Sequence, residues 1–136
     1  MNECIFSAGA LLLRLGLGGA MLVHGLQKFK LILNGGAEKW LDPIGIGAAN
    51  SLYLATFTEL VCSALVILGL FTRTASVFIS ITMFVAAFVF LKNAAWSDRE
   101  LAVVFLFGFI ALAVLGGGNY SLSNLIFKTN FLLGNL

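Results

Sequence analysis

The chain has 136 residues, of which 60% are hydrophobic and only 10% are charged. Its mean hydropathy of +1.04 lies outside the range of soluble globular domains. The formal net charge of +2 is too small to indicate nucleic-acid binding. The composition predicts an integral membrane protein, folded as a single domain over residues 1–136, whose first partners are membrane lipids.

Four apolar segments are long enough, or nearly so, to cross a hydrocarbon core of about 30 Å as helices. They cover roughly residues 5–27, 51–71, 74–91 and 100–117. The first segment is not typical of a cleavable signal, because Glu3 is its only early charge and Arg14 interrupts its apolar core. We therefore expect an all-α fold, an integral membrane four-helix bundle.

The first connection, residues 29–50, is long and contains several glycines. We expect a short interfacial helix over residues 37–41, ended by Pro43, the only proline in the chain. Asn50 or Ser51 is the expected N-cap of the second helix, because short polar side chains accept hydrogen bonds from the first free amides.

Basic residues near the ends of the apolar segments predict how the chain crosses the membrane. The side with the first and third connections carries Lys28, Lys30, Lys39, Lys92 and Arg99. The opposite side carries Arg73 and Lys128. Because cytoplasmic loops hold the excess of lysine and arginine, we expect the termini to lie outside.

Ionisable side chains inside the apolar segments are the candidate functional residues. Such a group near the bilayer centre costs about 2.5–3.5 kcal/mol on insertion scales, so it normally faces the protein interior and finds a partner. Arg14, His24 and Lys28 share one stripe of the first helix, and Glu59 lies on the polar face of the second. These four residues form the predicted intramembrane polar site, and no catalytic role is assigned to any of them.

Depth along the helices divides this group. If the first helix leaves the membrane near Lys28, His24 lies about 6 Å and Arg14 about 21 Å below that surface, and Glu59 about 10 Å. His24 and Glu59 can therefore share a polar pocket that opens toward the first and third connections. Trp96 and Glu100 are its expected rim.

Structural roles are an open alternative for the same residues. Arg14 and Glu59 are candidates for an interhelical ion pair, and His24 for a hydrogen-bond donor within the bundle. Lys28 is a candidate for an anchor whose ammonium reaches the headgroups. Trp40 and Trp96 fit the aromatic belt of a membrane interface.

The chemistry open to this group is limited. A histidine beside a buried carboxylate can exchange protons near neutral pH and would suit the carbonyls of a quinone. The single histidine excludes bis-histidine haem, and a zinc site would lack ligands, so no metal is expected. Cys4 and Cys62 are too far apart for a C-x-x-C motif and are expected to be inert buried thiols. We expect no cofactor in the chain itself, with a quinone as the candidate ligand.

Three sequence motifs follow one another along the chain. They are LLLRLGLGGAMLVHGLQKF, TFTELVCSALVILGLFTRTASV and GGGNYSLSNLI. Together they resemble the DoxX family of small bacterial membrane proteins. In that family an arginine, a His-Gly pair and a lysine follow one another in the first span, and a glutamate and a Leu-Gly turn ending in Thr-Arg follow in the second. The corresponding positions here are Arg14, His24, Gly25, Lys28, Glu59, Leu68, Gly69, Thr72 and Arg73.

The closing motif departs from the family pattern Gly-Pro-Gly-basic-Tyr-Ser-Leu-Asp. Gly117 replaces the proline, Asn119 the basic residue and Ser123 the aspartate. A role that depends on those charges, such as a salt bridge closing the bundle, is therefore not carried over to this chain.

The resemblance implies a multi-pass protein of the bacterial cytoplasmic (inner) membrane. Family members are similar to the small subunit of an archaeal thiosulfate:quinone oxidoreductase, and others are linked to membrane oxidoreductase complexes that handle oxidative stress. We therefore expect a subunit of a quinone-linked or oxidative-stress-related membrane oxidoreductase complex, with a redox partner protein or a second copy of itself. Whether the chain is itself an enzyme stays open.

Two other functions compete with this one. A non-catalytic assembly or partner-stabilising factor, or a small lipid or solute carrier, would suit the same glycine-rich first helix. A proton-coupled transporter is disfavoured, because four spans without a visible repeat are few for alternating access.

Overall fold

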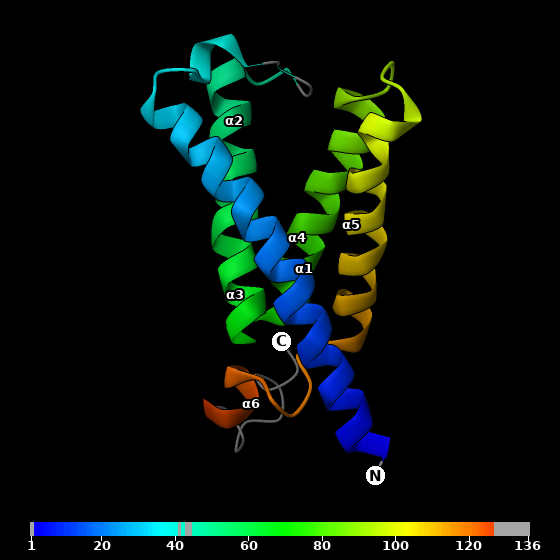
Figure 1. The fold of residues 1–136 in the computed structure, drawn as a ribbon. Helices are drawn as coiled ribbons and strands as arrows, with labels where there is room; N and C mark the ends of the chain where they lie inside the picture. Colours follow the sequence, from blue (N-terminus) through cyan, green and yellow to red (C-terminus); the bar gives the residue numbers. More distant parts are fainter. Residues whose placement is uncertain (1, 41, 43–44, 127–136) are drawn as a thin grey trace.

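The computed structural model describes residues 2–40, 42 and 45–126, and every element in that part of the chain is helical. Four long arms form the bundle (Figure 1). They are α1 (Asn2–Leu33), α2 (Ala48–Phe57) continued by η2 (Thr58–Cys62) and α3 (Ser63–Leu68), α4 (Thr72–Val85) continued by η3 (Ala86–Phe90), and α5 (Trp96–Leu115). Two short elements are η1 (Ala37–Lys39) and α6 (Leu122–Ile126). The predicted all-α bundle is confirmed.

Three arms of the described chain are long and apolar enough to cross a membrane, namely Asn2–Leu33, Ala48–Leu68 and Thr72–Phe90. The arm α5 is not among them, because Asp98, Arg99 and Glu100 interrupt its apolar sequence near the start. All four arms nevertheless turn large apolar side chains outward. Leu12, Leu54, Phe78 and Phe107 are each at least half exposed. Such surfaces are typical of lipid contact.

The first helix is longer than expected. The predicted span 5–27 ended at the first lysine, whereas α1 continues to Leu33 and so includes Lys28 and Lys30. Charge ends a membrane crossing but does not end a helix, and lysine is a good helix former. The helix stops where Gly35 adopts a positive φ of 76°.

The first connection differs from its prediction in two ways. The expected helix over 37–41 is a single 3₁₀ turn, Ala37–Lys39, while Leu41 and Pro43 lie outside the described residues. The second helix begins at Ala48, so neither Asn50 nor Ser51 is its N-cap, and Gly47 holds that position.

The carboxylate of Asp42 replaces the expected cap. It accepts hydrogen bonds from the backbone amides of Gly45 (2.9 Å), Ile46 (3.0 Å) and Gly47 (2.8 Å), and the Ser51 hydroxyl donates to it at 3.0 Å. The Gly47 bond, more than the others, lowers the pKa of Asp42 below its ordinary value. The loop is therefore organised by a charged residue that precedes the glycines.

A short turn joins α3 to α4. The amide of Gly69 donates to Val66 O (3.1 Å) and that of Leu70 to Leu65 O (2.9 Å), which is a Schellman motif with Gly69 at φ 79°. Phe71 then takes a left-handed φ of 48°, a conformation that bulky residues rarely adopt.

Ser123 holds this turn from the other side. Its amide donates to Gly69 O at 3.1 Å, and its hydroxyl accepts from the amide of Phe71 at 3.3 Å. The family pattern has an aspartate at this position. Here the neutral Ser123 connects α6 to the turn by hydrogen bonds.

The arms are close together at the end that holds the N-terminus and α6, and they separate toward the other end (Figure 1). There α1 and α2 lie on one side and α4 and α5 on the other. The core is formed mainly by α4 and α5, with Ile79, Phe109 and Leu112 fully buried.

The two cysteines have different surroundings. Cys62 is buried in the core, as predicted, but Cys4 is exposed. The prediction for Cys4 is wrong because the first turns of α1 extend past the packed part of the bundle (Figure 1). Its sulfur lies 3.4 Å from the hydroxyl of Tyr120, so it contacts the segment that follows α5.

Candidate functional site

A cavity of about 330 Å³ lies where the arms separate, with walls from α1, α2, η2, α4, η3 and α5. This volume falls in the range of small-molecule sites. Most of its lining is apolar or aromatic. The polar or ionisable residues that line it are His24, Lys28, Trp40, Ser51, Glu59, Thr82 and Asp98.

An ion pair crosses from α1 to η2 in this cavity. Lys28 Nζ lies 2.7 Å from Glu59 Oε2. The Glu59 side chain is 3% exposed and that of Lys28 is 22% exposed. Lys28 therefore neutralises a carboxylate that would otherwise be buried without a partner.

A glycine allows the two helices to approach this closely. A Cβ on Gly25 would lie 2.8 Å from the carbonyl carbon of Glu59 and from the amide nitrogen of Leu60. The backbone of α1 thus touches the backbone of η2 between His24 and Lys28. This contact brings the turn of α1 that carries both residues against the segment of η2 that carries Glu59.

The segment that carries Glu59 is a π-helix, Thr58–Cys62, inserted between α2 and α3. The hydroxyl of Ser63 donates to the carbonyl of Glu59 and so satisfies an acceptor within the irregular turn. Single π turns inside α-helices occur frequently at functional sites. The sequence contains no signal that predicted this one.

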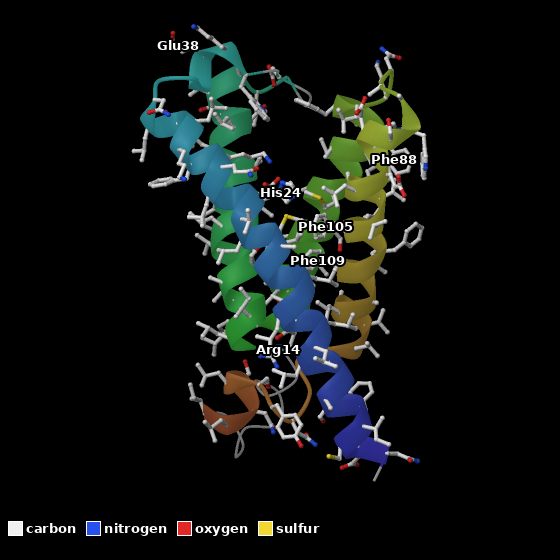
Figure 2. All side chains as sticks on the ribbon, in the orientation of Figure 1. Arg14, His24, Glu38, Phe88, Phe105 and Phe109 are labelled. Carbon is white, nitrogen blue, oxygen red and sulfur yellow. The ribbon has the colours of Figure 1, made fainter. Side chains whose placement is uncertain are left out.

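His24 faces the space between the arms (Figure 2). Its ring is half-buried and meets Phe105 edge to face, with ring centroids 5.8 Å apart and an interplanar angle of 84°. Within the described part of the chain, neither imidazole nitrogen has a hydrogen-bond partner. The imidazole lines the cavity with its hydrogen-bonding capacity unused by these residues.

Trp40 covers the connection end of the cavity. Its ring stacks on Phe90 of η3, with centroids 5.5 Å apart and an interplanar angle of 26°. Lys28 Nζ lies 6.0 Å from the centre of the Trp40 ring. A residue interpreted from the sequence as a membrane-belt tryptophan thus bridges the two sides of the opening.

A second π-helix, η3, lies on the wall opposite η2. Arg99 Nε donates to the carbonyl of Ala87 at 2.9 Å, and the guanidinium carbon lies 5.4 Å from the centre of the Phe88 ring. Arg99 therefore supports the irregular segment from outside the cavity.

The predicted rim is wrong in its residues. Trp96 and Glu100 do not line the cavity, and Trp96 is 60% exposed. Asp98 and Leu101 line it instead. A helix turns by about 100° per residue, so Glu100 lies on a different face of α5 from its neighbour Leu101.

Arg14 is at the other end of the bundle (Figure 2) and does not line the cavity. Its Nε donates to Val66 O (3.0 Å), and Nη2 donates to Ile67 O (2.9 Å). Its Nη1 donates to Gly117 O and Tyr120 O, both at 3.1 Å. The predicted alternative of an ion pair between Arg14 and Glu59 is wrong.

The C-terminus of α3 explains the position of Arg14. The last carbonyls of a helix have no hydrogen-bond partners within it and carry partial negative charge. A guanidinium at that position donates hydrogen bonds to them and also balances their charge. Arg14 is 1% exposed and also holds the segment after α5. Its geometry is that of a structural clamp.

Among the described residues, no group of three or more histidine, cysteine, aspartate or glutamate side chains is arranged to hold a metal ion. The residues that line the cavity offer hydrogen-bonding groups, one ion pair and aromatic surface.

The fold and the cavity together define a helical membrane protein with a polar site inside its bundle. The DoxX family model matches residues 9–92, and the chain belongs to the DoxX family. It is 33% identical over 129 residues to a protein of Bacillus subtilis (strain 168) named "Putative oxidoreductase CatD", across 94% of this chain and 93% of that protein. No solved structure matches the chain.

Proposed function

We propose that this protein is a quinone-binding subunit of a membrane oxidoreductase complex. One observation carries the proposal: the unpartnered imidazole of His24 faces a cavity of about 330 Å³ beside the Lys28–Glu59 ion pair. The name of the Bacillus subtilis relative contains the word oxidoreductase, which supports a redox context.

The residues around the cavity suit a quinone ring. A quinone carries two carbonyl oxygens on a flat ring, and an imidazole N–H of His24 is a donor for one of them. Phe105 and Trp40 supply flat apolar surface. The carbonyl oxygens of a quinone gain protons as the ring gains electrons, and the Lys28–Glu59 ion pair lines the same cavity. The electrons come from a partner protein that carries a redox cofactor.

The two tryptophans of the chain provide a direct test. In a Trp96→Phe variant Trp40 is the only tryptophan and lines the cavity, so a naphthoquinone should quench its fluorescence saturably. In a Trp40→Phe variant only the exposed Trp96 remains, and no saturable quenching is expected.

His24→Ala in the Trp96→Phe background should weaken binding about two- to tenfold, because one hydrogen bond is worth about 0.5–1.5 kcal/mol. Gln27→Ala, an exposed polar change on the same helix, should leave the affinity unchanged. Absence of saturable quenching at Trp40, or equal quenching of both tryptophans, would reject the proposal. Capture of one stoichiometric partner without quinone binding would favour an assembly factor.

We further propose that the chain crosses the bacterial cytoplasmic membrane several times, with the cavity end facing the cytoplasm. Lys28, Lys30, Lys39, Lys92 and Arg99 gather at that end. The exposed Cys4 marks the other end, and the buried Cys62 is an internal control. A maleimide that does not cross membranes should label Cys4 in intact spheroplasts. Labelling only after lysis would reverse the orientation.

A further inference from the structure

The cavity has a polar side and an apolar side. His24 and Lys28 of α1, together with Asp98 of α5, supply charged or polar groups. The α2 and α4 walls present Leu54, Ala55, Ile81 and Val85. Thr82 and Ser51 also lie there, but the Thr82 hydroxyl donates to the carbonyl of Phe78 and the Ser51 hydroxyl to the Asp42 carboxylate, each at 3.0 Å. One cavity thus combines a polar site with an apolar slot, by which we mean the part between α2 and α4 lined by Leu54, Ala55, Ile81 and Val85. The first suits a polar head and the second an apolar chain.

The apolar side opens toward the bilayer. Leu54 is 51% exposed and Ile81 is 56% exposed, although both line the cavity. The helix α4 packs against η2 and α3, whereas α2 leads away from it toward the open end (Figure 1). A hydrocarbon chain can therefore pass between α2 and α4 without leaving an apolar environment.

Charge at the polar side selects against anionic heads. The lining holds one cation, Lys28, against two carboxylates, Glu59 and Asp98. Lys28 is already bonded to Glu59 at 2.7 Å. A phosphate head would thus meet no unpaired cation among the residues that line the cavity, whereas a neutral carbonyl head would find the imidazole of His24.

We infer that the cavity takes a neutral amphiphile with a long isoprenoid chain, whose head meets His24 and whose chain leaves the bundle sideways between α2 and α4. This inference rests on the proposed function, because the neutral head is the quinone ring. It specifies a lipid-soluble quinone that enters from the bilayer and excludes phospholipid.

A bulky residue between α2 and α4 tests whether the ligand's apolar chain, and not only its head, is bound there. Ile81→Trp should weaken binding of a long-chain menaquinone about tenfold, equivalent to about 1.4 kcal/mol, in nanodiscs of phosphatidylcholine. Binding of a tailless naphthoquinone should change less than twofold. Val77→Trp is the matched control, because Val77 lies one turn away on α4, is 47% exposed and does not line the cavity. It should affect neither ligand. Calorimetric titration measures both without depending on tryptophan fluorescence.

The outcomes are distinct. If the wild-type protein binds neither quinone, the proposed function fails. If it binds both and Ile81→Trp weakens both equally or neither, the lateral slot is wrong while the proposed function stands. Leu54→Trp repeats the test from the opposite wall should Ile81→Trp not fold. Replacing phosphatidylcholine with phosphatidylglycerol should not displace menaquinone, and displacement would identify a phospholipid site instead.

Discussion

Lys28 on α1 and Glu59 on η2 form an ion pair, with 2.7 Å between Nζ and Oε2, beside the point where Gly25 brings the two backbones into contact. The pair is unequal, because the Glu59 side chain is 3% exposed and that of Lys28 is 22% exposed. The two partners should therefore respond differently to mutation.

Lys28→Met should destabilise the protein more than Glu59→Gln. Breaking a buried ion pair costs about 3–5 kcal/mol when the remaining charge stays buried and unpaired. Glu59 would be left in that state, whereas an unpaired Lys28 can extend toward the membrane surface. Thermal unfolding in detergent micelles measures both, and the double variant should recover most of the loss. Additive losses in the double variant would show that the two residues are not coupled.

Gly25→Ala should separate α1 from η2. The new Cβ would lie 2.8–2.9 Å from backbone atoms of Glu59 and Leu60, which cannot rotate away, and overpacking of this kind costs about 1–3 kcal/mol. Gly19→Ala on the same helix is the control, because no atom lies within 4 Å of the position that its Cβ would take, and alanine favours a helix. A lower unfolding temperature is expected only for Gly25→Ala. Equal temperatures for the two variants would contradict the close contact.

Arg14→Lys should reduce stability without weakening ligand binding. A lysine ammonium has three donors and cannot reach four carbonyls spread over Val66, Ile67, Gly117 and Tyr120, so at least one is left unpaired at a cost of about 1–3 kcal/mol. The exposed Arg73 provides the control Arg73→Lys, which should leave the unfolding temperature unchanged. Folded Arg14→Lys protein should bind naphthoquinone with wild-type affinity. Weaker binding would place Arg14 in the site.

Asp42→Asn should change the pH dependence of stability. Hydrogen bonds, above all from Gly47, lower the pKa of the Asp42 carboxyl in the folded protein. Its contribution is therefore present above the unfolded-state pKa of about 3.9 and is lost as the pH falls through the lower folded pKa. Wild type should unfold at a higher temperature than Asp42→Asn at pH 7, and the difference should begin to shrink as the pH falls below about 4. A difference in unfolding temperature that stays constant as the pH falls below about 4 would contradict this assignment.

Much of the fold follows from composition and period. The apolar segments predicted the long arms, and counting 1.5 Å per residue separated Arg14 from His24 and Glu59. That count depends only on helix geometry, so it survives in the structure. The predicted rim residues, Trp96 and Glu100, were wrong because they were chosen by depth alone. Depth fixes how far along a helix a residue lies, but the face it presents depends on how α5 packs, and Asp98 rather than Glu100 faces the cavity.

Partners were harder to predict than positions. A sequence shows charges, so Glu59 was the natural partner for Arg14, whereas the actual partners are main-chain carbonyls at a helix end. The sequence allowed Lys28 to be either a site residue or a headgroup anchor, and its contact with Glu59 depends on the approach at Gly25. The hydrophobic pattern did not predict the two π-helices, because each is only five residues long and lies within a continuous apolar segment.

The short turn between α3 and α4 and the hydrogen bonds of Arg14 join the arms at one end of the bundle. A relative movement of the arms that keeps these contacts would be a rotation with that end as its pivot. Displacement grows with distance from the pivot, and Ile81 lies about 14 Å along α4 from Thr72. Small changes in packing near Gly69 would thus be magnified at the slot, so residues remote from the cavity can set how wide it stands.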